Sequence, residues 1–161
     1  MSRRSLLLYG IGAVVIYLAT IMLNVNIATL GYLSVTDALI MIMASSFKPG
    51  YAALMGAVPA VLATFTLHYG RYALVIFLIK GLEGWLIAFS AARHQKPWIY
   101  TLAVGAMVLV GDGIADALLY GSWNMFTISI GYHAIEVALC TIVALLICPL
   151  WNKVCEKFLD D

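Results

Sequence analysis

Long uninterrupted apolar segments constrain this chain more than any other feature. The first runs from Ser5 to Leu23 with hardly a polar side chain, close to the length of about 20 residues that a helix needs to cross a bilayer. Hydrophobic residues make up 64% of the 161 residues and charged residues only 11%. So few charges cannot keep so much apolar surface in water. The sequence therefore predicts an all-α integral membrane protein.

Breaks between the apolar segments divide the chain into a six-transmembrane-helix bundle, a single membrane domain over residues 1–161. Asn24 to Val35 is too polar and too Gly-interrupted to continue in lipid, so we expect a loop there. Ser34 or Thr36 is expected to cap the next helix, with Asp37 in its first turn. This second helix is short, at about 18 Å. The expected helices cover about 5–23, 36–47, 51–67, 72–92, 98–120 and 126–151.

The basic residues orient these six spans. Lys and Arg are enriched in cytoplasmic loops, and alternate connections differ sharply in their content. One set of alternate connections contains a single basic residue, Arg71. Lys80 lies within a helix and belongs to neither set. This distribution predicts that the N and C termini are both cytoplasmic. The basic residues of the other set of connections, which this distribution places in the cytoplasm, are Arg3, Arg4, Lys48, Arg93, Lys96, Lys153 and Lys157.

Several function classes are disfavoured by the sequence. A net charge of +1 provides no basic field for a nucleic acid. The cysteines Cys140, Cys148 and Cys155 form no CxxC pair and have no His at ligand spacing, so neither a disulfide framework nor a metal site is expected. The chain contains no Gly-x-x-x-x-Gly-Lys-Ser/Thr loop for ATP phosphates. We therefore expect no catalytic residues, no metal and no cofactor in this chain.

Ionisable residues inside the spans indicate a binding site. Such residues are costly in lipid and usually mark a site or pathway. With the orientation above, all of them lie between the outer surface and about the midplane, which predicts a blind outward-facing pocket for a small polar molecule. Three pairs share helix faces, and Trp123 and Asn124 lie in a short outer loop above them. The pairs are Lys80 with Glu83, Asp112 with Asp116, and His133 with Glu136.

Each of these groups also has a structural interpretation. Lys80 and Glu83 are at the spacing of a neutralising intrahelical pair. Asp116 is close enough to the outer end of its helix to be solvated. His133 is placed to bond Glu136 in the core.

Three segments resemble the substrate-binding S components of energy-coupling factor (ECF) vitamin transporters. They are Leu33 to Ile42, Phe47 to Gly56, and Ile79 to Gly84 with its Lys-Gly-Leu-Glu-Gly element. The resemblance covers roughly residues 33 to 92 and is strongest to the riboflavin, hydroxymethylpyrimidine and pyridoxine subgroup. It implies six helices in a bacterial cell membrane, an outward-facing vitamin pocket and no ATPase activity. It also implies partners: a transmembrane coupling subunit and two cytoplasmic ATPases that use ATP.

The resemblance implies a high-affinity capture subunit for a small heterocycle such as hydroxymethylpyrimidine or pyridoxine. The ligand ring would stack on Trp123 or a neighbouring Tyr, with polar groups around its edge. Small residues on helices one and three suit close docking to the coupling subunit, although helix one lacks the Ala-x-x-x-Ala motif common in the family. The expected docking residues are Gly10, Ala13, Ala53 and Ala57, and the expected polar groups are Lys80, Glu83, Asp112, Asn124, His133 and Glu136.

The same residues suggest two other functions. An intramembrane metal-dependent transferase would use Asp112 and Asp116 as ligands, but two carboxylates are too few for such a centre. A small proton-coupled carrier would need polar groups through the whole membrane thickness. The apolar inner half of the spans disfavours the carrier.

Overall fold

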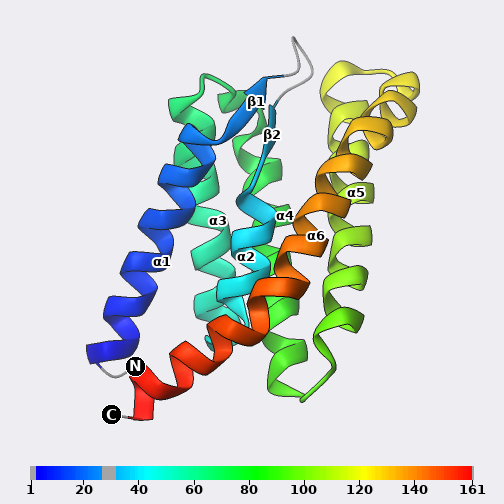
Figure 1. The fold of residues 1–161 in the computed structure, drawn as a ribbon. Coiled ribbons are helices and arrows are strands. Elements are labelled where there is room, and N and C mark those ends of the chain that lie inside the picture. The colour runs from blue at the N-terminus through cyan, green and yellow to red at the C-terminus, as the bar shows by residue number, and fades with distance from the viewer. Residues whose placement is uncertain (1–2, 27–31, 161) are drawn as a thin grey trace.

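The computed structural model describes residues 3–26 and 32–160. Figure 1 shows α1 and α3 on one side of a helical bundle, α5 and α6 on the other, and α2 and α4 between them. The N-terminal end of α1 and the C-terminal end of α6 lie at the same end of the bundle (Figure 1). The elements in order are α1 (Arg3–Met22), β1 (Asn24–Asn26), β2 (Tyr32–Ser34), α2 (Thr36–Ala44), α3 (Pro49–Thr66), the 3₁₀ helix η1 (Gly70–Tyr72), α4 (Ala73–Ala92), α5 (Pro97–Tyr120) and α6 (Trp123–Asp160).

Proline and glycine define several helix ends. Pro49 and Pro97 occupy the first turns of α3 and α5, where the missing N–H group costs nothing. Gly121 ends α5 in the left-handed conformation, with φ of 65°, which glycine adopts without strain. α6 continues to Asp160, beyond the expected end at 151, because no glycine interrupts the residues after Pro149.

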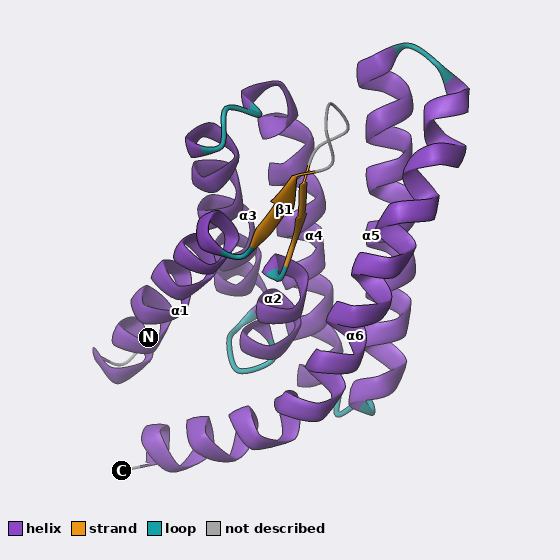
Figure 2. Cartoon of the chain, turned by 45° about the horizontal axis from the view of Figure 1, so that its top comes forward, coloured by secondary structure: helices purple, strands orange, loops and turns teal. Residues whose placement is uncertain are grey.

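The connection between the first two helices corrects the expected loop. β1 and β2 pair antiparallel, with Asn24 opposite Ser34. Figure 2 shows β1 following α1 and β2 leading into α2. The predicted cap is also wrong: Val35 occupies the N-cap position without a side-chain hydrogen bond. The Thr36 hydroxyl instead shares a 2.7 Å hydrogen bond with the Thr20 hydroxyl of α1, so it joins two helices.

Five helices of the described chain are long and apolar enough to span a membrane: α1, α3, α5, α6 and α4 together with η1. Large apolar side chains cover the outside of the bundle, with Leu6 61%, Leu78 61% and Leu146 70% exposed. The predicted helical membrane bundle is thus confirmed. α2 has only nine residues, about 13.5 Å of helix against a hydrocarbon core of about 30 Å. The count of six crossings stays a prediction.

The inner helix α2 and a close α3–α4 crossing position the polar residues. Eight of the nine α2 residues are buried. A Cβ added at Gly56 would lie 2.3 Å from the Lys80 backbone oxygen, and one at Gly84 would lie 2.2 Å from the Ala52 oxygen. Only glycine permits backbones to approach this closely. The crossing fixes the part of α4 that carries Lys80.

Candidate functional site

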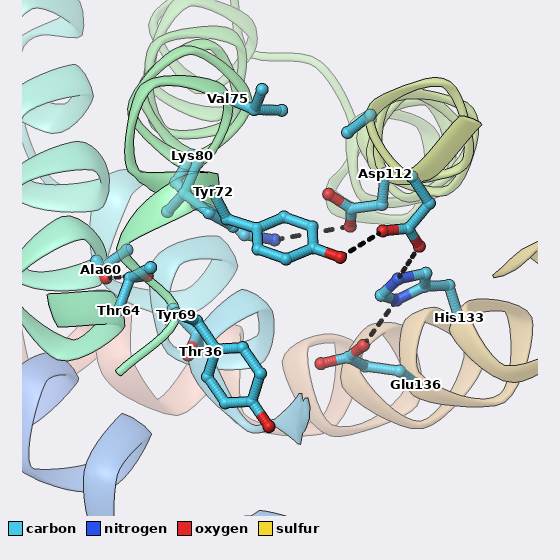
Figure 3. Close-up of a pocket in the computed structure, with 13 residues that line it drawn as sticks. Thr36, Ala60, Thr64, Tyr69, Tyr72, Val75, Lys80, Asp112, His133 and Glu136 are labelled. Carbon is cyan, nitrogen blue, oxygen red and sulfur yellow. Dashed lines mark hydrogen bonds and ion pairs between the residues drawn. The ribbon is translucent and has the colours of Figure 1, made fainter. Parts of the chain in front are cut away.

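A cavity of about 60 Å³ lies where α2, α3, η1, α4, α5 and α6 meet. The structure brings four of the predicted site residues together in its wall: Lys80, Asp112, His133 and Glu136. Figure 3 shows the Tyr72 ring extending toward these charged side chains, and Tyr69 also lines the cavity. The four charged residues come from three helices, α4, α5 and α6, so only the tertiary fold creates the site.

The Lys80 ammonium group is surrounded by carboxylates from three helices. Asp37 of α2 is its nearest ion-pair partner. The Glu83 Oε2 atom lies 3.8 Å from the ammonium nitrogen and the Asp112 Oδ2 atom lies 4.0 Å from it. Lys80 is 7% exposed and Asp37 1%. The Lys80–Glu83 contact within α4, which the sequence suggests, is therefore longer than the Lys80–Asp37 contact, because α2 brings Asp37 closer to the ammonium group.

Asp116 is held by hydroxyl groups and is not solvated near the surface. The hydroxyls of Tyr72, Ser129 and Tyr132 donate hydrogen bonds to its carboxylate at 2.9, 2.5 and 2.6 Å. Its side chain is buried, with the whole residue 2% exposed. Asp116 thus joins η1, α5 and α6 around the cavity.

His133 connects Asp116 with Glu136. Its Nδ1 atom lies 3.0 Å from Glu136 Oε2, and its Nε2 atom lies 3.7 Å from Asp116 Oδ2. Figure 3 shows the His133 ring joined to Glu136 by one of these contacts. The contact expected from the spacing of His133 and Glu136 is confirmed.

Three predicted site residues lie outside the cavity wall. Glu83 is fully buried behind Lys80, and neither carboxylate oxygen has a hydrogen-bond partner. Trp123 is 71% exposed and makes an edge contact with Phe126, and Asn124 is also exposed. Of the two expected stacking groups, Trp123 or a tyrosine, the structure places tyrosines at the cavity, Tyr69 and Tyr72, and leaves Trp123 outside its wall.

The expected docking residues differ in accessibility. Gly10 is exposed with open space around it, and Ala13 is half-buried. Ala53 is half-buried on α3. Ala57 is 1% exposed and faces Gly81 of α4, so the docking role expected for Ala57 is wrong. Its small size serves the α3–α4 contact.

The described residues contain no cluster of three or more His, Cys, Asp and Glu side chains arranged to hold a metal ion. Asp112 and Asp116 also have different partners, Lys80 for the first and hydroxyl groups for the second. The geometry therefore gives no support to the metal-dependent transferase.

Sequence reasoning missed several residues that complete the site. The sequence indicates Asp37 only as a first-turn acid and gives no sign that Tyr69, Tyr72 and Thr64 belong to a site, although these three line the cavity. Their common signal is a polar atom near the end of an apolar span. That signal was visible, but it does not say which way the side chain points.

Comparison with known families is consistent with this architecture. Residues 1–153 match the model of the family described as "ECF-type riboflavin transporter, S component". A search of curated proteins finds no match. S components are substrate-binding membrane subunits that pair with ECF transporter modules and are not enzymes. Because the match covers nearly the whole chain and the fold is a multi-pass helical bundle, this protein belongs to the S-component family of ECF-type riboflavin transporters.

Proposed function

We propose that this S component captures a small single-ring nitrogen heterocycle, hydroxymethylpyrimidine or a pyridoxine-like compound, in the cavity beside Lys80. The observation that carries the proposal is the size and lining of this cavity. Its volume of about 60 Å³ accommodates about four waters at roughly 15 Å³ each, which fill about 120 Å³ as liquid. One substituted six-membered ring displaces about that much water, whereas a three-ring flavin needs considerably more space.

The lining suits such a ring chemically. Tyr69 and Tyr72 offer aromatic surface, and aromatic pairs contribute about 0.5–1.5 kcal/mol beyond the area they bury. Lys80 can donate a hydrogen bond to a ligand hydroxyl, and Asp112 and Glu136 can accept from ligand N–H and O–H groups. A few fixed polar groups within apolar walls are typical of small-molecule pockets.

Ligand titration tests this substrate class. Isothermal titration of the purified chain with hydroxymethylpyrimidine, pyridoxine and riboflavin should show tightest binding for a single-ring compound. Glu136→Gln keeps the side-chain shape but removes a charged acceptor from the cavity wall, so affinity should fall roughly ten- to a hundredfold. Glu156→Gln, 20 residues beyond Glu136 on α6, is the matched control and should bind normally. Tight riboflavin binding without single-ring binding would refute the proposal.

We further propose that transport needs a transmembrane coupling subunit and two cytoplasmic ATPases. The absence of a P-loop from the sequence supports this division of labour. Vesicles that contain the chain alone should bind substrate without accumulating it, and adding the partner subunits with ATP should start uptake. ATP-dependent uptake by the chain alone would contradict the proposal.

In the proposed topology, α2 and the β1–β2 hairpin together complete a sixth crossing and both termini are cytoplasmic. The turns before and after α4 offer a matched test at His68 and His94. Both residues are exposed and both have positive φ, 64° and 54°, so the two cysteine variants carry similar strain. The native cysteines are buried. In intact cells a membrane-impermeant maleimide should label His68→Cys but not His94→Cys, and the reverse result would invert the topology.

A further inference from the structure

The cavity and its surroundings contain more buried acid than base. Around it lie five carboxylates, each 9% exposed or less: Asp37, Glu83, Asp112, Asp116 and Glu136. Lys80 and His133 are the only basic side chains in the cavity wall of the described chain. Even with His133 protonated, five ionised carboxylates face two cations. An uncompensated buried charge is expensive, so further protons or a positive ligand must balance this site.

The shortage of positive charge is concentrated around Lys80. Asp116 is already stabilised by three hydroxyl donors, and His133 contacts Glu136. By contrast, three carboxylates share the single Lys80 ammonium group. Glu83 has no hydrogen-bond partner on either oxygen, and Asp112 reaches Lys80 only at 4.0 Å. Asp112 is the one of these two that lines the cavity.

We propose that the cavity binds its ligand as a cation, with a protonated ring nitrogen donating a hydrogen bond to Asp112. This inference rests on the proposed function and narrows its substrate class to basic heterocycles. The ring nitrogen takes its proton from a protonated solvent molecule, so one N–H bond forms as one solvent O–H bond breaks, and no other bond changes. When the ligand neutralises Asp112, the Lys80 ammonium is left to Asp37 and Glu83, which lies 3.8 Å away. Glu83 then shares that ammonium group with one other carboxylate, Asp37, in place of two.

The same charge balance rejects anionic ligands. A phosphate ester of the same heterocycle would add negative charge beside Asp112 and Glu136 in a poorly solvated site. The cavity wall of the described chain has no third basic side chain to receive it. The cavity therefore selects the free vitamin over its phosphorylated form.

A ligand pair tests the proposal on the unaltered protein. Isothermal titration compares pyridoxine with its benzene analogue, in which CH replaces the ring nitrogen, and with pyridoxine 5′-phosphate. Hydroxymethylpyrimidine is compared with its own benzene analogue in the same way. Because a charge-assisted hydrogen bond is lost, the benzene analogue should bind at least about tenfold more weakly. The phosphate ester should also bind at least about tenfold more weakly.

A variant assigns the effect to Asp112. Asp112→Asn should bind the heterocycle and its benzene analogue with nearly equal affinity, whereas Glu156→Gln should keep the difference. Equal affinities on the unaltered chain would show that the carboxylates are neutralised by their own protons. That result overturns this inference and leaves the proposed function standing. Failure of every single-ring compound to bind, with riboflavin bound, would instead refute the proposed function.

Discussion

Replacing Gly84 by alanine should separate α3 from α4 and loosen the Lys80 region. The added Cβ would lie 2.2 Å from the Ala52 backbone oxygen, whereas real Cβ contacts essentially never fall below 3.0 Å. The obstructing atom belongs to the backbone, so no side-chain rotation relieves the clash. The two helices must move apart by about 0.8 Å, and a gap of about 0.5–1 Å forfeits a quarter to a half of the dispersion attraction across it. Overpacking of this kind costs about 1–3 kcal/mol.

Thermal unfolding in detergent measures this cost. For a chain of this size each kcal/mol corresponds to about 2–4 °C in Tm, so Gly84→Ala should unfold at least about 2 °C lower. Gly81→Ala is the matched control on the same helix, because its Cβ would have ordinary contacts at 3.5 Å with Ala57 and 3.7 Å with Ala53. An unchanged Tm for Gly84→Ala, or equal losses for both variants, would refute the argument.

Three further substitutions test other parts of the structure. Tyr72→Phe removes a 2.9 Å hydrogen bond to the Asp116 carboxylate and should lower the free energy of unfolding by about 1.5–3 kcal/mol in denaturant titration; no loss would mean that the bond contributes nothing. Trp123→Ala should leave ligand affinity within about twofold, since the residue is 71% exposed, and a tenfold loss would place it in the site. Ala57→Leu should destabilise the isolated chain by about 1–3 kcal/mol, whereas Gly10→Leu, at an open position, should not; equal Tm values would show that Ala57 has free space.

The helices were largely predictable because each is an apolar run bounded by proline, glycine or charge. Pro49 and Pro97 begin helices close to the expected positions. The β1–β2 hairpin was not predictable, because β1 and β2 have three residues each and short mixed segments carry no clear period. The end of α6 was also missed, since its last turns are polar and lack the apolar signal used to define spans.

The candidate site was predictable in depth but not in direction. Position along a helix follows from the rise per residue, so Lys80, Asp112, His133 and Glu136 were correctly expected at similar levels. Which face of each helix turns inward depends on contacts between helices. For this reason the sequence did not show that Asp37 would become the nearest partner of Lys80, or that Trp123 would be exposed and outside the cavity wall.

The shortness of α2 has a consequence for biogenesis. Nine residues are too few to be held in a bilayer by their own hydrophobicity, which requires about 20, and α2 carries the acidic Asp37 as well. Its burial depends on α3, α4 and α6, which it contacts, and all three are synthesised after it. α2 therefore takes its final place only once the later helices are in the membrane, so insertion of this segment is a step of tertiary folding.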